Sequence, residues 1–278
     1  MKVIAESGST RTEWALVDGD KTVEHAFTQG LNPYFQSRRD LSHIIRLEMP
    51  EVFFRRRWDH IHFYGAGCTN LEKKKIVEAS LVAQFKTPVT VESDLLAAAR
   101  GLFVKDRGIA CILGTGSNSC LYDGENIIKN VRPAGFILGD EGSAATLGKL
   151  FLSDCLKNLA PRQLTEEFYS TFSVNPDMLM DVVYTGSMPN RALSSYSFFL
   201  ADHQGIEYVD ELIYRNIKSF FERNIIQYDY QTEQIAFVGK IANVFPKVLK
   251  KVAKEYGLKI RKIAPNSLFG LIKYHSNE

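Results

Sequence analysis

The sequence predicts an α/β fold built from two similar domains. Along the first part of the chain, short apolar stretches typical of strands alternate with amphipathic stretches typical of helices. A strand–glycine turn–strand pattern then begins again at Ile109, 105 residues after Ile4. At this offset Ile4, Ala5, Thr10, Leu16, Asp18 and Gly19 match Ile109, Ala110, Thr115, Leu121, Asp123 and Gly124. Because these matches keep their order, they indicate an internal duplication.

The first copy opens with a strand, a polar glycine turn and a returning strand, which the Asp18-Gly19 pair closes as a hairpin. Strands are expected at residues 3–5, 13–17, 61–64 and 89–92, and helices at 71–84 and 94–103. Ser93 stands where a helix N-cap is expected, directly before Asp94.

The second copy repeats this opening and then becomes more helical, up to about residue 224. Strands are expected at 109–113, 119–122, 234–238 and 258–263, and helices at 143–158, 209–223, 243–256 and 266–274. The predicted domains are therefore residues 1–107 and 108–278, the second with a helical insertion.

The composition is that of a soluble globular protein, and the balanced charge does not favour nucleic-acid or membrane partners. The 278 residues are 45% hydrophobic, and 34 basic residues nearly balance 32 acidic ones. Neither a signal peptide nor a membrane-spanning stretch is expected. The four cysteines form no C-x-x-C pair, so a zinc or redox motif is not indicated, and reduced thiols favour a cytoplasmic location.

The two glycine turns are candidates for phosphate binding, because glycine lets the backbone approach a ligand closely. Gly8 and Gly116 are flanked by hydroxyl donors, namely Ser9, Thr10, Thr115 and Ser117. Either turn alone is compatible with an ordinary hairpin, but their matching positions favour phosphate binding. Neither is a Walker A loop or a dinucleotide fingerprint, since each leads into a strand.

Four segments carry a resemblance to a known family. Residues 6–12 and 114–119 resemble the two phosphate motifs of the actin/hexokinase-like superfamily. Residues 135–143 and 30–33 are similar to segments of N-acetylglucosamine kinases and their BadF/BadG/BcrA/BcrD relatives. The resemblance implies an RNase-H-like fold in each domain, with ATP and magnesium in an interdomain cleft. It also implies phosphorylation of N-acetylglucosamine or a related amino sugar.

The resemblance assigns roles to individual residues. Asp94 is expected to be the catalytic base, although from the sequence alone a helix-capping role explains it better, and only the surrounding motifs favour catalysis. Asp140 and Glu141 form a carboxylate pair that suits sugar hydroxyls, and Asn32 and Asn118 are further sugar candidates. The residues expected to bind ATP are Gly8, Ser9, Thr10, Arg11, Thr115, Gly116, Ser117 and Gly239.

Two positions depart from the family pattern. Glu6, the expected magnesium residue, replaces an Asp, and Lys240 stands where the adenosine motif has a second glycine. These departures leave open a regulator that has lost catalysis. A BadF-like ATPase activator of a partner enzyme is a further alternative, but it requires cysteines that hold an iron–sulfur cluster. The expected partners are a small-molecule sugar and ATP, and a homodimer stays open.

Overall fold

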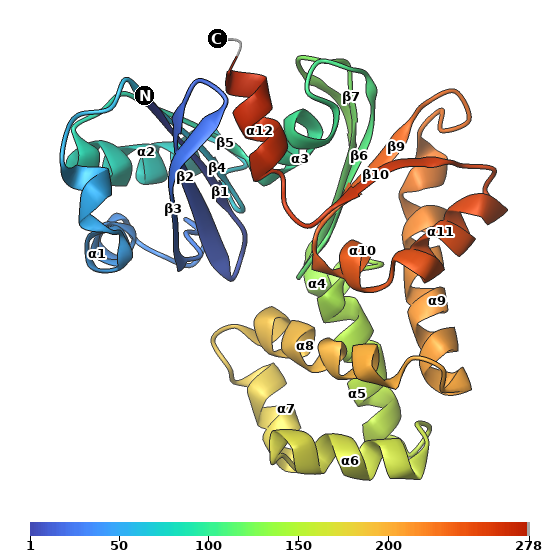
Figure 1. Cartoon of the computed structure of the whole chain (residues 1–278). Coiled ribbons are helices and arrows are strands. Elements are labelled where there is room, and N and C mark those ends of the chain that lie inside the picture. The colour runs from blue at the N-terminus through green and yellow to red at the C-terminus, as the bar shows by residue number, and fades with distance from the viewer. Residues whose placement is uncertain (277–278) are drawn as a thin grey trace. The chain divides into compact units, whose positions relative to one another are not determined.

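The computed structural model describes residues 1–276, within which the strands form two five-stranded sheets (Figure 1). The first sheet has the order β3-β2-β1-β4-β5. Its strands are β1 (Lys2–Ser7), β2 (Arg11–Asp18), β3 (Lys21–Gln29), β4 (His60–Gly65) and β5 (Val89–Ser93). β1, β2 and β3 are antiparallel neighbours, whereas β1, β4 and β5 run parallel.

Helices cover both faces of the first sheet, which explains why β1 is apolar along most of its length. Val3 and Ala5 lie in the core that includes residues of α1 (Arg38–Glu48) and α2 (Leu71–Phe85). Ile4 points to the opposite face, where it joins residues of α3 (Asp94–Phe103) and α12 (Leu268–His275). A short 3₁₀ helix, η1 (Glu51–Phe54), follows α1.

The second sheet repeats the strand order of the first. It runs β10-β9-β6-β7-β8. When the strands of each half are numbered in chain order and the second sheet is read from β8, both sheets have the order 3-2-1-4-5. Its strands are β6 (Gly108–Leu113), β7 (Ser117–Tyr122), β8 (Ile127–Val131), β9 (Ile235–Val238) and β10 (Ile260–Ala264). The identical order confirms the duplicated α/β fold that the 105-residue offset predicts.

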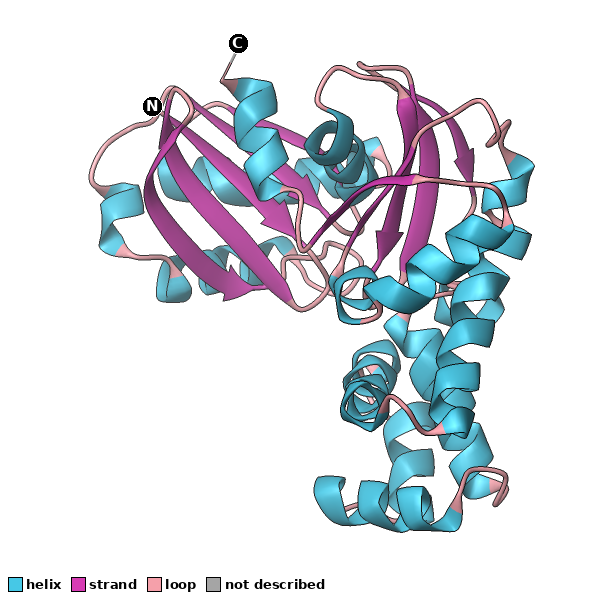
Figure 2. Cartoon of the chain, turned by 45° about the vertical axis from the view of Figure 1, so that its right-hand side comes forward, coloured by secondary structure: helices cyan, strands magenta, loops and turns pink. Residues whose placement is uncertain are grey.

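The segment between β8 and β9 is almost entirely helical (Figure 2). It holds α4 (Gly135–Leu138), α5 (Ala144–Leu156), α6 (Arg162–Phe172), α7 (Pro176–Tyr184), α8 (Pro189–Ser197), η2 (Phe198–His203), α9 (Glu207–Arg223) and η3 (Ile225–Gln227). Aromatic rings form the core of its middle part: Phe168 packs against Phe151, Phe172 and Phe199. Two further helices, α10 (Lys240–Val244) and α11 (Pro246–Glu255), separate β9 from β10.

The chain divides into two compact units. Unit 1 comprises Met1–Ala110, Tyr122–Ile128 and the stretch from Asn266 onward, and unit 2 comprises Cys111–Leu121 and Lys129–Pro265. The predicted domain limits, 1–107 and 108–278, stay a prediction. The compact units differ from them in one respect, because the stretch from Asn266 onward groups with unit 1. α12 belongs to unit 1, because its apolar residues Leu268, Leu271 and Ile272 are buried against the first sheet. Within residues 1–276, no helix is long and apolar enough to cross a membrane.

A histidine cluster joins α12 to β4 in unit 1. The rings of His62 and His275 stack with centroids 3.7 Å apart, and His60 lies 4.5 Å from His62. The Tyr64 hydroxyl is 2.8 Å from His275 Nε2 and accepts a hydrogen bond from Arg100. Burial is the main cause that lowers the pKa of His62 to about 2, and charge repulsion from His275, His60, Lys2 and Arg100 contributes to this shift.

This cluster predicts that the fold loses stability in acid. Below the ordinary histidine pKa of 6.5, His62 binds a proton in the unfolded chain but stays unprotonated in the folded chain. The free energy of unfolding should therefore decrease as the pH decreases below that value. The upper limit of this decrease is about 1.4 kcal/mol per pH unit, and the partial exposure of His62 makes the decrease smaller. Urea unfolding between pH 7 and pH 5 measures this slope, which His62→Gln should reduce. The same substitution at the exposed His43 is the control, and an unchanged slope in His62→Gln would refute the assignment.

Candidate active site

Three parallel strands of unit 1, β1, β4 and β5, end level with one another, and β1 and β5 are each followed by a predicted functional segment. In the register of the sheet, Gly65 at the end of β4 pairs with both Ser7 and Ser93. The first glycine turn follows Ser7, and Asp94 follows Ser93. Because the carboxyl ends of parallel strands meet at one sheet edge, these segments gather there.

The first glycine turn is fixed by hydrogen bonds and close backbone packing, but it leaves space next to Gly8. Gly8 donates to the Arg11 carbonyl at 3.0 Å, and the Ser7 hydroxyl accepts from the Leu31 amide at 2.9 Å. A Cβ atom at Gly30 would lie 2.5 Å from the Gly8 carbonyl oxygen, whereas a Cβ atom at Gly8 would meet only Arg11 O, at 3.7 Å. The turn is thus fixed by its neighbours while space for a ligand remains at Gly8.

The other predicted phosphate residues of this turn differ in their surroundings. Ser9 is half-buried and Thr10 is exposed. The Arg11 guanidinium lies over the ring of Phe27, 4.3 Å from its centroid. This contact directs the Arg11 side chain along β3, so its role in phosphate binding stays a prediction.

Glu6 is the predicted magnesium residue, and it lies in a crowded acidic environment. Glu13 faces it across β1 and β2, and the Ser267 amide donates to Glu6 Oε2 at 2.7 Å. Burial is the main cause that raises the pKa of Glu6 to about 7. Hydrogen bonds from Ser267 oppose this rise, and the negative charges of Glu13 and Asp94 contribute to it. Within residues 1–276, no group of three or more His, Cys, Asp or Glu side chains is arranged to bind a metal directly.

Glu13 is a site residue that the sequence analysis missed. Its Oε1 atom is 2.8 Å from His25 Nε2, and its Oε2 atom accepts from Asn266 Nδ2 at 2.8 Å. Pairing the two predicted strands about the glycine turn would have placed Glu13 opposite Glu6. The contact with Asn266 had no such signal, because 253 residues separate the partners.

Asp94 occupies the first position of α3, and the capping role belongs to its neighbour. The Ser93 side chain accepts from the Leu96 amide and is the N-cap. Burial raises the pKa of the Asp94 carboxyl, although hydrogen bonds from the Leu95 and Asp94 amides oppose this shift. A carboxyl group that is not needed as the cap and has a raised pKa suits general-base chemistry.

Asn32 is fixed beside the end of β4. Its side-chain Oδ1 atom accepts from the Tyr34 backbone amide at 3.0 Å, and the backbone amide of Asn32 donates to Gln36 Oε1 at 2.6 Å. The Asn32 side chain packs so closely on Gly67 that a Cβ atom there would lie 2.2 Å from Oδ1. Asn32 and Asp94 therefore come to the same edge of the first sheet.

The second glycine turn, in unit 2, is tied to the start of α5. Gly114 donates to the Gly116 carbonyl at 3.0 Å. The carbonyl oxygens of Gly114 and Thr115 accept from the first two amides of α5, those of Ala144 and Ala145, at 2.9 and 3.1 Å. Thr115 is half-buried and Ser117 is buried at the start of β7. The turn and the helix are thus held as one rigid piece.

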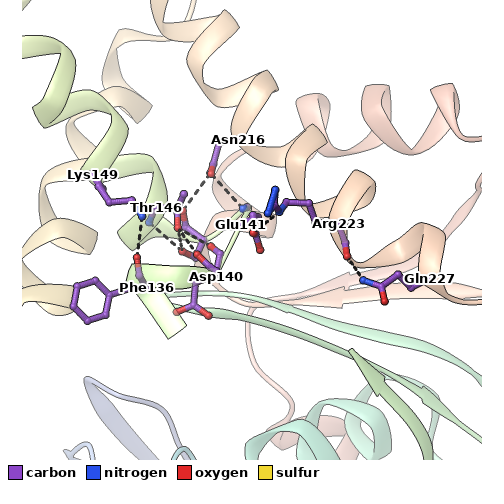
Figure 3. A network of polar contacts seen from close by, with 11 residues as sticks. Phe136, Asp140, Glu141, Thr146, Lys149, Asn216, Arg223 and Gln227 are labelled. Atoms are coloured by element: carbon purple, nitrogen blue, oxygen red, sulfur yellow. Dashed lines mark hydrogen bonds and ion pairs between the residues drawn. The ribbon is translucent and has the colours of Figure 1, made fainter. Parts of the chain in front are cut away.

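Asp140 and Glu141 are adjacent in sequence, but their carboxylates point to different sides (Figure 3). Asp140 has a φ of +55°, and a Cβ atom at Gly116 would lie 2.9 Å from its Oδ2. Glu141 instead forms an ion pair with Arg223 of α9, with 2.8 Å between Oε1 and Nε. The structure therefore brings only Asp140 to the second glycine turn, and the sugar role of Glu141 stays a prediction.

Two asparagines support this region of unit 2. Asn118 Oδ1 accepts from the Ser119 amide and from Asn130 Nδ2, each at 2.9 Å, so its oxygen is engaged within the protein. Asn216, which the sequence analysis missed, accepts from the Gly142 amide and donates to the Ser143 carbonyl, each at 3.2 Å. Its buried amide fixes the loop that carries Asp140.

Gly239 links the predicted adenosine segment to the second glycine turn. Its φ is +117°, and a Cβ atom would lie 2.4 Å from Leu113 O and 3.1 Å from Gly114 N. Lys240, the departure from the family pattern, places its ammonium over the Phe198 ring, 3.6 Å from the centroid. This contact with η2 holds the Lys240 side chain within unit 2.

The sequence matches no family model, and no curated protein matches it. Among solved structures, a candidate N-acetylglucosamine kinase from Porphyromonas gingivalis is 37% identical with a TM-score of 0.96, over 100% of this chain and 99% of that one. A candidate N-acetylglucosamine kinase from Chromobacterium violaceum is 16% identical with a TM-score of 0.77, over 98% of both chains.

A ROK-family glucokinase from Streptomyces griseus, solved with glucose and AMPPNP, is similar in fold alone. It is 13% identical with a TM-score of 0.60, over 98% of this chain and 97% of that one. The 37% identity over the whole chain carries the assignment to a family. The protein belongs to the N-acetylglucosamine kinase family of sugar kinases with the actin/hexokinase-like fold.

Proposed function

We propose that this protein is an ATP-dependent kinase that phosphorylates a hydroxyl group of N-acetylglucosamine or a related amino sugar. The observation that carries the proposal is Asp94, a carboxyl group with a raised pKa at the sheet edge where the first glycine turn and Asn32 also lie. The full-length likeness to a candidate N-acetylglucosamine kinase supports the choice of sugar.

The transfer follows from the roles of these residues. Asp94 accepts the proton of the sugar hydroxyl while that oxygen attacks the γ-phosphorus of ATP. The bond from the γ-phosphorus to the β–γ bridging oxygen breaks, and ADP leaves with the electron pair. The backbone amides and hydroxyl groups of the two glycine turns are donors for the phosphate oxygens. Asn32, Asn118 and Asp140 are proposed to orient the sugar, with Glu141 a weaker candidate because of its ion pair.

Magnesium, when bound, would neutralise charge on the β- and γ-phosphates. Glu6 would hold it, largely through water, since magnesium keeps several of its waters and prefers oxygen ligands. The neighbouring carboxyl groups and the raised pKa of Glu6 fit this role, because a cation relieves the crowding of negative charge. Glu6 thus stands in for the family's Asp.

An activator with an iron–sulfur cluster is less well supported. Cys68, Cys111, Cys120 and Cys155 are all buried. Burial raises the pKa of the Cys68 thiol to about 12 and that of Cys155 to about 11, which disfavours the thiolate that binds metals. A cytoplasmic location and a homodimer stay predictions.

A panel of sugars tests the function. ADP release in a coupled assay should depend on an added amino sugar, with N-acetylglucosamine or N-acetylmannosamine preferred over glucose. ATP hydrolysis that ignores every sugar would instead favour the activator. Nucleotide binding without any ADP release would favour a regulator that has lost catalysis.

A further inference from the structure

Two consecutive residues before α12 hold the two facing carboxylates at the first glycine turn. The Ser267 amide donates to Glu6 Oε2 at 2.7 Å, and the Asn266 side-chain amide donates to Glu13 Oε2 at 2.8 Å. All four residues belong to unit 1. A segment far along the chain thus sets the orientation of Glu6 and Glu13 together.

The packing of α12 on α3 explains how these donors are held in place. A Cβ atom at Gly270 would lie 1.9 Å from the Gly101 carbonyl oxygen, and one at Gly101 would lie 2.6 Å from Ser267 Cβ. The two helices are therefore in backbone contact, with no room to slide. Because α3 begins at Asp94, the same helix pair fixes both the proposed base and the donors to Glu6.

The charges in this region require such donors. Glu6 feels the negative charges of Glu13 and Asp94, while His25 and Asn266 both contact Glu13. Because like charges repel, the carboxylates of Glu6 and Glu13 would turn away from each other unless hydrogen bonds fixed them. With Oε2 bound to the Ser267 amide, Glu6 presents Oε1 as its second acceptor.

We propose that the Ser267 amide and the Asn266 side chain are positioning groups that hold Glu6 and Glu13 for phosphoryl transfer. This inference rests on the proposed kinase function. The start of the C-terminal helix would then control how the magnesium–nucleotide complex is bound, without touching the sugar. The predicted effect is on kcat and on the magnesium dependence of nucleotide binding, with an unchanged KM for the sugar.

A pair of substitutions separates the Ser267 amide from the Ser267 hydroxyl, both of which lower the pKa of Glu6. Ser267→Pro removes the N–H donor, whereas Ser267→Ala keeps it, and a φ of −93° at this helix start is near the range that proline adopts. Losing a hydrogen bond to a charged group corresponds to about a 10–100-fold effect. We expect Ser267→Pro to lower kcat and to weaken magnesium-dependent ADP binding by about this factor. Ser267→Ala keeps the backbone donor but loses the hydroxyl, which also lowers the pKa of Glu6, so we expect its kcat and ADP affinity to lie between those of the parent and Ser267→Pro.

Calorimetry of ADP binding with and without magnesium supplies a readout that does not depend on turnover. Like Ser267→Pro, Asn266→Ala should weaken ADP binding when magnesium is present. It should leave ADP binding unchanged when magnesium is absent. Asn175→Ala is the control, because it removes the N-cap of α7, which accepts from the Met178 amide, and touches none of these residues.

The outcomes are decisive even if Ser267→Pro does not fold, because Asn266→Ala then decides alone. If a folded Asn266→Ala keeps the parent kcat and the parent magnesium-dependent ADP affinity, the positioning role is wrong. A parent protein that consumes no ATP with any sugar would refute the proposed function instead, so the two failures are distinguishable.

Discussion

Replacing Asp94 by Asn is expected to lower kcat by about 10²–10⁴-fold, the usual contribution of a general base. The amide has nearly the same size and polarity as the carboxyl group, but it cannot accept the proton of the sugar hydroxyl. Sugar binding should persist, because the substitution leaves the neighbouring loop of Asn32 intact. Steady-state kinetics together with sugar binding by calorimetry separate the two effects.

The structure supplies a control for the role of Asp94 at the helix terminus. Ser93 is the N-cap of α3, so Ser93→Ala should reduce stability by about 1 kcal/mol while retaining most of the activity. If Asp94→Asn stays within a few-fold of the parent rate and loses only stability, Asp94 serves the helix and not the reaction.

The fold could be predicted from the sequence because the duplication leaves a local trace. Each copy opens with a strand, a glycine turn and a second strand, and the Asp-Gly pairs at Asp18 and Asp123 mark the hairpins. The shared strand order and the relative from Porphyromonas gingivalis confirm both the fold and the family. β8 was not predicted, since its sequence, Ile127–Val131, is largely exposed and lacks an apolar alternation. α1 was likewise not predicted, although its buried Leu41 and Ile45 lie one turn apart.

The candidate site was only partly predictable, because several of its contacts join distant parts of the chain. No local pattern announces that Ser267 reaches Glu6 or that Asn266 reaches Glu13. The Asp140-Glu141 dipeptide reads as one acidic pair, yet the positive φ of Asp140 turns its carboxylate to Gly116 while Glu141 meets Arg223. Side-chain direction depends on backbone dihedrals and on partners that the sequence does not specify.

Gly239→Ala is expected to reduce both stability and nucleotide affinity. A φ of +117° with a ψ of 166° is a conformation that residues with a Cβ atom rarely adopt, and the strain amounts to about 1–3 kcal/mol. The new methyl group would also lie 2.4 Å from Leu113 O and 2.7 Å from Leu113 C, which are backbone atoms and cannot rotate away. We therefore expect the free energy of unfolding to fall by about 2–5 kcal/mol when strain and overpacking combine.

The functional effect of this substitution follows from where the methyl group would push. Leu113 ends β6 and precedes Gly114, so the second glycine turn should shift with it, and small misplacements of binding groups have large effects on rate. The dissociation constant for ATP should rise at least about tenfold, and nucleotide titrations of the folded variant measure it. Gly205→Ala is the matched control: its φ is +100°, but a Cβ atom there meets nothing within 4 Å, so it carries the strain without the contact. If the two variants lose equal stability and both keep the parent affinity for ATP, the contact between Gly239 and the second glycine turn has no functional role. If only Gly239→Ala loses affinity, the close approach of these two backbone segments is what places the phosphate-binding turn.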